Sequence, residues 1–170
     1  GVSCGDYRRN GAFAEYVSVP ARVLYRLPPE LPFTEAAMIE AVSVALHAVA
    51  VSGFSAGQTA VVIGAGMIGT LIVQALRVAG ASHILAADLD PTRLAEATRS
   101  GAHTTINPKE GRDTIAQLLS RFPSGVEHAF EAVGATATVE QAIAAVRKGG
   151  TVTLVGNIAP QVEIPLQSVV

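Results

Sequence analysis

A glycine-rich segment at residues 64–69, GAGMIG, has the spacing of a phosphate-binding turn. It follows the apolar run TAVVI and leads directly into the helix-like stretch TLIVQALRVAG. Gly64 permits a tight turn from strand to helix, Gly66 lets the backbone approach a pyrophosphate, and Gly69 lets the helix lie close to the strand. The start of that helix offers unpaired N–H groups and a partial positive charge to phosphates. The segment is therefore a candidate dinucleotide-binding turn.

An acidic residue, Asp88, closes the next apolar run, HILAAD, nineteen positions after Gly69. A carboxylate there can accept hydrogen bonds from both hydroxyls of an adenosine ribose, and it repels a phosphate on the 2′ oxygen. A lone GxGxxG also occurs in turns that serve only packing. The strand before it, the helix after it and the acid at this distance together favour a dinucleotide, with NAD preferred over NADP.

Short apolar runs alternate with longer amphipathic runs from Thr59 onward, which is typical of βα units. The expected strands cover residues 59–63, 83–88, 103–106, 126–131 and 150–155. The expected helices cover residues 66–79, 91–100, 112–121 and 136–147. This alternation predicts an α/β fold, a doubly wound parallel sheet of the Rossmann type with five parallel strands and the phosphate turn at its switch point.

Turn and cap residues support these boundaries. Asp90 precedes Pro91, which suits the first position of a helix, and Asp90 is expected to cap that helix. Gly80, Gly101 and Gly149 stand where helices are expected to end.

Residues 1–57 have a different pattern and are expected to be the remnant of a catalytic domain with its connector, whereas residues 58–170 form the NAD-binding domain. Residues 12–19, AFAEYVSV, alternate as a strand does, and VLYRLP suggests another short strand. Thr34 is a plausible helix N-cap, and one or two helices are expected from there to Gly53.

The composition excludes two classes of partner. Of the 170 residues, 49% are apolar and 15% charged, and the net charge is −2. Lysine and arginine occur singly or in pairs, so we expect no nucleic-acid partner and no anionic membrane surface. The apolar stretches are interrupted before they reach about 18 residues, the length of a membrane span. A parallel sheet covered on both faces explains the mean hydropathy of +0.40 better.

Cys4 is the only cysteine, which excludes a disulfide within the chain and favours a cytoplasmic setting. It stands alone and is expected to be incidental rather than a zinc ligand. The first ten residues, GVSCGDYRRN, do not have the pattern of a signal peptide. Because the first residue is not Met, we expect the sequence to be a piece of a longer protein.

Several segments together resemble the medium-chain dehydrogenase/reductase superfamily, which includes the zinc-dependent alcohol and polyol dehydrogenases. They are GAFAEYVSVP, LPPELPFTEAAMIEAVSVALHAV, GAGMIG, AADLDPTRL, FEAVG and TLVGN, and they extend over essentially the whole chain. MIEAVSVALHA is most similar to the sorbitol-dehydrogenase-like branch, which usually reads EPL where this chain reads EAV.

The resemblance implies a set of coenzyme contacts. In chain order the cofactor-binding residues would be Gly64, Gly66, Met67, Ile68, Gly69, Asp88, Arg93, Ala132, Val133, Val155, Gly156 and Asn157. Arg93 would add a contact to the ribose that Asp88 holds, and Ile68 would lie behind the nicotinamide ring. Residues 132–133 would flank the adenosine end, and residues 155–157 would lie along the nicotinamide.

The resemblance also implies zinc, which in complete members of the family polarises the alcohol oxygen before hydride passes to the nicotinamide. Glu40 occupies the position at which classical alcohol dehydrogenases carry a zinc-ligand cysteine, so it is a candidate metal-site residue, directly or through water; otherwise it is a solvated or ion-paired carboxylate. A catalytic zinc needs about three protein ligands. The family's upstream Cys, its Gly-His-Glu segment and its four-cysteine lobe do not occur here and would precede Gly1. No catalytic residue is assigned, and the chain alone is expected to be inactive.

The leading hypothesis is the coenzyme-binding part of an NAD- and zinc-dependent dehydrogenase that oxidises a small-molecule alcohol or polyol. The alternatives are an NADP-linked or zinc-free reductase of the same superfamily and a non-catalytic module that senses NAD. Asp88 argues against NADP. The connector that carries Glu40 argues against the sensor. The substrate stays open, because most of its pocket would come from the missing domain.

The remaining features concern packing and assembly. QVEIPL, residues 161–166, predicts a short edge strand, and a homodimer or higher homo-oligomer is expected. We expect the edge of the fifth strand to be covered by the N-terminal strand, by a neighbouring molecule or by residues 162–166. His47 is expected in the core, the other histidines are expected to be structural, and Glu131 is either a structural partner or a site residue.

Overall fold

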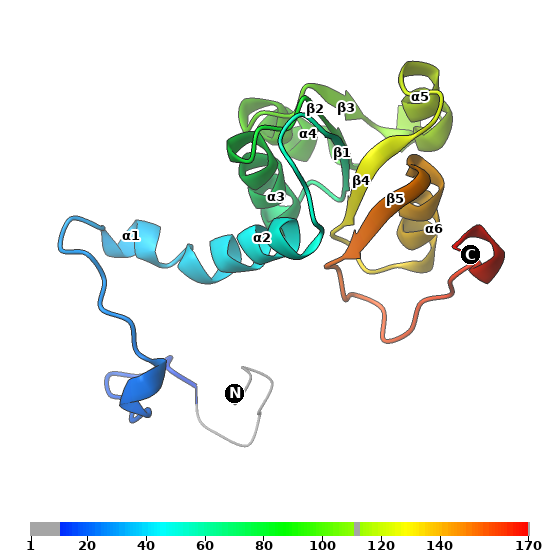
Figure 1. The fold of residues 1–170 in the computed structure, drawn as a ribbon. Helices are drawn as coiled ribbons and strands as arrows, with labels where there is room; N and C mark the ends of the chain where they lie inside the picture. Colours follow the sequence, from blue (N-terminus) through cyan, green and yellow to red (C-terminus); the bar gives the residue numbers. More distant parts are fainter. Residues whose placement is uncertain (1–10, 111–112, 170) are drawn as a thin grey trace. The chain divides into compact units, whose positions relative to one another are not determined.

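Five parallel strands form the central sheet of the protein, whose computed structural model describes residues 11–110 and 113–169 (Figure 1). The strands are β1 Thr59–Ile63, β2 His83–Ala87, β3 Thr104–Ile106, β4 Val126–Glu131 and β5 Val146–Leu154. Their order is β3-β2-β1-β4-β5, and every neighbouring pair is parallel. The chain changes direction across the sheet between β1 and β4, and ligands of open α/β sheets bind beyond the strand ends at such a switch point. The predicted doubly wound sheet is confirmed.

Helices cover both faces of this sheet (Figure 1). These helices are α2 Ile39–Val51, α3 Met67–Val78, α4 Pro91–Arg99, α5 Thr114–Arg121 and α6 Thr136–Ala145. The described residues also form short helices, which are η1 Ala21–Val23, α1 Phe33–Ala36, η2 Pro108–Glu110 and η3 Leu166–Ser168. None of them, within the residues described, is long and apolar enough to cross a membrane.

The strands β1 and β2 are apolar after their first residue because both of their faces are buried. In β1, Ala60 and Val62 pack against α2, α3 and α4 on one face, whereas Val61 and Ile63 pack against α5 and α6 on the other. Successive side chains of a strand point to opposite faces, so a sheet covered on both sides needs a continuous apolar run. TAVVI and HILAA meet that requirement, which explains why both strands were predictable.

Most of the expected helix boundaries are confirmed. Asp90 caps α4 through a hydrogen bond in which the Thr92 N–H donates to Asp90 Oδ1 at 2.8 Å. Gly80 and Gly101 follow α3 and α4 with φ of +84° and +114°, a region that favours glycine. Gly149 is different: α6 already ends at Ala145, and Gly149 lies within β5.

The predicted start of the fifth strand and end of the preceding helix were therefore wrong. Val146 pairs with Val126, but the next pair along the ladder joins Thr151 to His128. Residues 147–150 are looped out of the register at this irregularity, and their glycines and charged side chains gave the sequence no strand-like pattern.

Four other local predictions were also wrong. Residues 12–19, VLYRLP and residues 161–166 contain no strand in the structure, and Thr34 lies inside α1, whose N-cap is Pro32. Alternation gives a strand only where another strand supplies hydrogen bonds, and the sheet of the described residues offers them none. Phe13 and Tyr16 are accordingly exposed.

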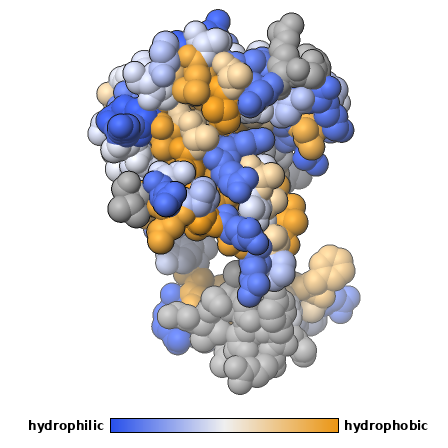
Figure 2. Space-filling view, turned by 90° about the vertical axis from the view of Figure 1, so that its right-hand side faces the viewer, coloured by the Kyte–Doolittle hydropathy of each residue, from blue (hydrophilic) through white to orange (hydrophobic). Residues whose placement is uncertain are grey.

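The outer edge of β5 has no strand partner in the described part of the chain. A groove of about 860 Å³ lies beside it, lined by β5, α6 and residues 164–169. Hydrophobic side chains gather on this side of the molecule (Figure 2). Residues 162–166 form no strand that pairs with this edge, and cover by the N-terminal part or by a neighbouring molecule stays a prediction.

The chain divides between Ala37 and Met38 into two units. Helix α2 packs against α3 and so belongs to the unit that holds the sheet, although the sequence placed it in the 1–57 connector. The origin of residues 1–57 in a catalytic domain stays a prediction.

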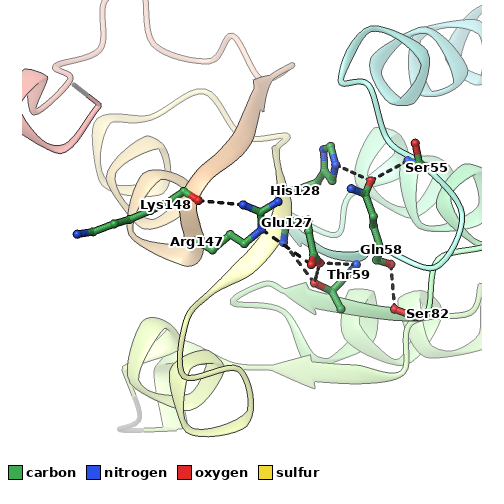
Figure 3. A network of polar contacts seen from close by, with 8 residues as sticks. All are labelled: Ser55, Gln58, Thr59, Ser82, Glu127, His128, Arg147 and Lys148. Atoms are coloured by element: carbon green, nitrogen blue, oxygen red, sulfur yellow. Dashed lines mark hydrogen bonds and ion pairs between the residues drawn. The ribbon is translucent and has the colours of Figure 1, made fainter.

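A polar network joins the amino-terminal ends of β1, β4 and β5 (Figure 3). Glu127 Oε2 accepts hydrogen bonds from the Thr59 N–H, at 2.8 Å, and from the Thr59 hydroxyl. These bonds hold the pKa of Glu127 below its usual value, because they favour the ionised carboxylate. Arg147 Nε lies 3.9 Å from Glu127 Oε1. The network closes the end of the sheet opposite the glycine-rich turn.

The imidazole of His128 is buried in this network. Gln58 Oε1 accepts from the Ser55 N–H at 2.8 Å and lies 2.9 Å from His128 Nε2, which therefore donates. His128 Nδ1 is then unprotonated, and it is buried without a hydrogen-bond partner in the described structure. Burial lowers the pKa of His128, because a second proton would have no acceptor. The neighbouring Arg147 acts in the same direction, and Glu127 opposes it.

We expect the free energy of unfolding to fall as the pH drops below 6.5, the ordinary histidine value. The unfolded chain takes up a proton at His128 there, whereas the folded protein does so only at lower pH. The contribution of His128 to the free energy of unfolding is present in full above pH 6.5. Urea unfolding at a series of pH values measures it, with His128→Gln removing the titrating group and the exposed His47→Gln as control. An identical pH dependence in the parent and H128Q would contradict this account.

Candidate functional site

The turn after β1 is shaped by two glycines that are needed for packing. Gly64 has φ +92°, and a Cβ at this position would lie 2.6 Å from Val133 Cγ2. A Cβ at Gly69 would lie 1.8 Å from the Gly64 carbonyl oxygen, so α3 can start this close to β1 only without a side chain there. Both glycines act as the sequence predicted, by permitting the turn and the close approach of helix and strand.

Gly66 differs from these two because no protein contact requires it. It is the N-cap of α3, with φ −68° and ψ −167°, and an added Cβ would meet no atom within 4 Å. No side chain of the described residues caps the helix, so the first N–H groups of α3 keep their hydrogen-bonding capacity. Open space above free N–H groups at a positive helix end fits a diphosphate.

Asp88, at the end of β2, faces the same turn. Its Oδ2 accepts from the Ala65 N–H at 2.8 Å, and its Oδ1 accepts from the Asp90 N–H at 2.9 Å. Arg93 Nη1 lies 3.7 Å from Asp88 Oδ2, and Arg93 Nε lies 3.9 Å from Asp90 Oδ2. The carboxylate is thereby held in position, with lone pairs left for a sugar hydroxyl.

Asp90 adds a second negative charge at this end of the site. The hydrogen bond from the Thr92 N–H lowers the pKa of Asp90. Lys109 and Arg93 supply cations beside the two carboxylates. The site therefore offers both signs of charge to a ligand at the end of β2.

A cleft of about 650 Å³ connects these groups at the carboxyl ends of the strands. Four predicted residues line it, namely Gly64, Asp88, Arg93 and Val133. The sequence did not assign to the site the other residues that line the cleft, which are Ile63, Ala87, Leu89, Asp90, Pro91, Pro108, Lys109, Ala137, Thr138 and Gln141. Most of them follow β2 and β3 or lie in the first turns of α6, and their position just after predicted strands was the available signal.

The other predicted cofactor residues do not line this cleft. Ile68, Ala132 and Val155 are half-buried and pack against the core cluster beneath α3. Gly66, Gly69 and the exposed Met67 lie at the start of α3. Their part in binding stays a prediction.

Gly156 and Asn157 belong to the loop after β5, which packs tightly on the loop after β4. A Cβ at Gly156 would lie 2.1 Å from the Gly134 N, and a Cβ at Gly134 would lie 2.3 Å from the Asn157 N. The two loops are thus in backbone contact, and the fold brings both to the carboxyl edge of the sheet.

The residues that the structure describes do not by themselves fit a catalytic zinc. Glu40 is exposed in the first turn of α2, and no group of three or more His, Cys, Asp or Glu side chains in the described residues could hold a metal ion. Cys4 lies outside the described residues. A zinc ion bound by Glu40 would need its other ligands from elsewhere.

The histidines divide into buried and surface positions. His47, expected in the core, is exposed on α2. His83 and His103 stack with their ring centroids 4.9 Å apart, and His103 Nδ1 accepts from the Ile84 N–H at 3.0 Å. Burial and the nearby His103 and Arg121 lower the pKa of His83. These rings hold β2 and β3 together at the end of the sheet away from the cleft.

Comparison with known proteins gives consistent matches. The zinc-binding dehydrogenase family model matches residues 67–170, more than half of the chain. The chain is 39% identical over 145 residues to (R,R)-butanediol dehydrogenase of Bacillus subtilis (strain 168), and 36% identical over 158 residues to sorbitol dehydrogenase of the same organism. These alignments cover 85% and 92% of this chain but 42% and 44% of the relatives, so the chain spans less than half of their length.

A solved structure supports the same grouping. The crystal structure of a putative zinc-binding dehydrogenase from Sinorhizobium meliloti 1021, bound to NADP, superimposes with a TM-score of 0.86 at 33% sequence identity. The match covers 95% of this chain and 48% of that chain. The superposition includes most of the sheet and its helices.

The two glycines at the start of α3 should respond differently to alanine. Gly69→Ala places a methyl group against a backbone carbonyl and should lower the free energy of unfolding by about 3 kcal/mol or more. Gly66→Ala meets open space and should cost no more than about 1 kcal/mol, the difference between glycine and alanine at an N-cap. Chemical unfolding of both variants measures this. Equal destabilisation would show that the space at Gly66 is not open.

Proposed function

The chain belongs to the zinc-binding dehydrogenase family, and we propose that it is the coenzyme-binding part of an enzyme that oxidises an alcohol or polyol with NAD. The observation that carries the proposal is the uncapped start of α3, open above Gly66 and lying beside the Asp88 carboxylate. Bound NAD would supply the hydride acceptor. Relatives named as butanediol and sorbitol dehydrogenases support the substrate class.

Each part of the site would hold one part of the coenzyme. The N–H groups at the start of α3 would bind the pyrophosphate, because the helix end is positive and the glycine leaves room for close approach. Asp88 would accept hydrogen bonds from the adenosine ribose, and Arg93 would help to orient that carboxylate. Ile68 and residues 155–157 would line the nicotinamide and keep water from it.

NAD is proposed over NADP on electrostatic grounds. A 2′-phosphate at the ribose would approach the carboxylates of Asp88 and Asp90. Arg93 lies within 4 Å of both carboxylates, so much of its charge is already balanced there. An NADP-linked enzyme is the second candidate, because Lys109 adds a cation to the cleft and one structural neighbour is bound to NADP.

Zinc chemistry and substrate binding would depend on residues beyond this chain. The family match implies zinc, and Glu40 would contribute at most one contact to it. The single cysteine supports a cytoplasmic location. The unpaired edge of β5 and the apolar groove beside it support a homodimer or higher homo-oligomer.

The chain should bind NADH at least about tenfold more tightly than NADPH, a difference of 1.4 kcal/mol. Fluorescence titration with each nucleotide measures the two affinities. Asp88→Ala removes the ribose acceptor and the negative charge, so it should weaken NADH binding and reduce the preference. Asp113→Ala, at the N-cap of α5, is a matched control that removes a carboxylate away from the cleft. Equal affinity of the parent for both nucleotides would overturn the NAD assignment.

The 170-residue chain should bind NADH without oxidising butanediol or sorbitol, with or without added zinc, because its described residues hold no set of three metal ligands. Steady-state NADH formation is the measurement. A longer product of the same gene that includes the preceding coding sequence is the positive control, and it also separates a dehydrogenase from an NAD sensor. Turnover by the short chain would contradict the proposal.

A further inference from the structure

Glu131 lies at the middle of the carboxyl edge of the sheet. In the ladder it pairs with Ile63 of β1 on one side and with Leu154 of β5 on the other. The loops that follow these three strands are the glycine-rich turn, the FEAVG loop and the TLVGN loop. Its side chain is 0% exposed, so this carboxylate lies fully inside the protein, below the cleft.

One oxygen of this carboxylate organises the loop that follows it. Glu131 Oε1 accepts from the Val133 N–H at 2.9 Å and from the Gly134 N–H at 2.8 Å. It lies 2.7 Å from the hydroxyl of Thr138, on the first turns of α6. These bonds tie the end of β4, the FEAVG loop and the start of α6 to a single atom.

The main chain of Glu131 holds the next loop in the same way. Its carbonyl oxygen accepts from the Val155 N–H at 2.8 Å and from the Gly156 N–H at 3.0 Å. Gly156 in turn packs against the backbone of Gly134 without room for a side chain on either residue. The loops after β4 and β5 are therefore positioned by one residue.

Packing alone does not account for a glutamate at this position. A buried carboxylate costs several kcal/mol unless it is well paired, and an apolar side chain of similar volume fills the same space at lower cost. The second oxygen, Oε2, is buried and has no hydrogen-bond partner within the described structure. The acceptor oxygen Oε1 is what an apolar residue would lack, and its two backbone donors would then be left unsatisfied.

We infer that Glu131 is a positioning residue for the coenzyme, acting through Val133 and Gly134. Val133 lines the cleft, and it lies so close to the glycine-rich turn that a Cβ at Gly64 would be 2.6 Å from Val133 Cγ2. The hydrogen bond from the Val133 N–H to Glu131 fixes the part of the cleft wall that faces Gly64. The hydrogen bond from the Gly134 N–H to Glu131 fixes the backbone contact with Gly156. This inference rests on the proposed function, because it assigns a role toward the same bound coenzyme.

The test compares three variants of the 170-residue chain by NADH titration and by thermal unfolding. Glu131→Ala removes the acceptor. Glu131→Gln keeps an acceptor oxygen of the same reach while removing the charge. Glu127→Ala is the matched control, since Glu127 lies on the same strand at the opposite end of the sheet, bonded to Thr59. Binding is measured below the unfolding temperature of every variant.

We expect E131A to lose at least about tenfold in NADH affinity and E131Q to stay within about threefold of the parent. We expect E127A to lower the unfolding temperature while leaving the affinity within about twofold of the parent. E131A binding as tightly as E127A would overturn the inference, and so would E131Q losing as much as E131A, since charge rather than acceptor geometry would then matter. A parent that binds no NADH would overturn the proposed function, and the inference with it.

Discussion

The close contact between the first turn of α3 and the Gly64 carbonyl fixes the geometry on which the cleft depends. Because Gly69 carries no side chain, the helix begins directly beside the end of β1, and its free N–H groups point to the switch point of the sheet. Asp88 reinforces this arrangement by accepting the Ala65 N–H from the neighbouring strand end. The same few backbone atoms thus determine the position of the open helix start and how far the Asp88 carboxylate stands from it.

The two ends of the sheet serve different purposes. At the amino end, side chains bond to one another as well as to backbone N–H groups: Glu127 with the hydroxyl and N–H of Thr59, and His128 with Gln58. At the carboxyl end, the side chains of Asp88 and Glu131 accept hydrogen bonds from backbone N–H groups of the loops. Parallel strands place all their carboxyl ends at one edge, so loops held rigid there form a site, whereas the opposite edge can be closed for stability.

Charge at the end of β2 decides which dinucleotide suits the cleft. Asp88 and Asp90 stand against Arg93, which contacts both, and Lys109 lies near them. Arg93 already interacts with both carboxylates, so less of its positive charge is available to a further phosphate. The electrostatic interaction with that phosphate is therefore less favourable than the equal number of cations and anions indicates. The proposed preference for NAD therefore rests on ion pairing within the site as well as on the identity of Asp88.

The sequence by itself determined the order of strands and helices in the α/β unit, the phosphate turn and its acid, because these features are local. The period of the hydrophobic residues, the positions of the glycines and the number of residues between Gly69 and Asp88 are properties of short segments. The sequence pattern wrongly predicted strands at residues 12–19 and 161–166, because an alternating segment forms a strand only beside another strand. It also misplaced the start of β5, because that start is set by pairing with β4. Only the tertiary structure shows that Lys109, Thr138 and Gln141 line the cleft. It also shows that Ile68 and Val155 pack against the core, and that Glu131 forms hydrogen bonds with two loops. Those contacts join residues far apart in the chain, and only the folding of parallel strands into one edge brings them together.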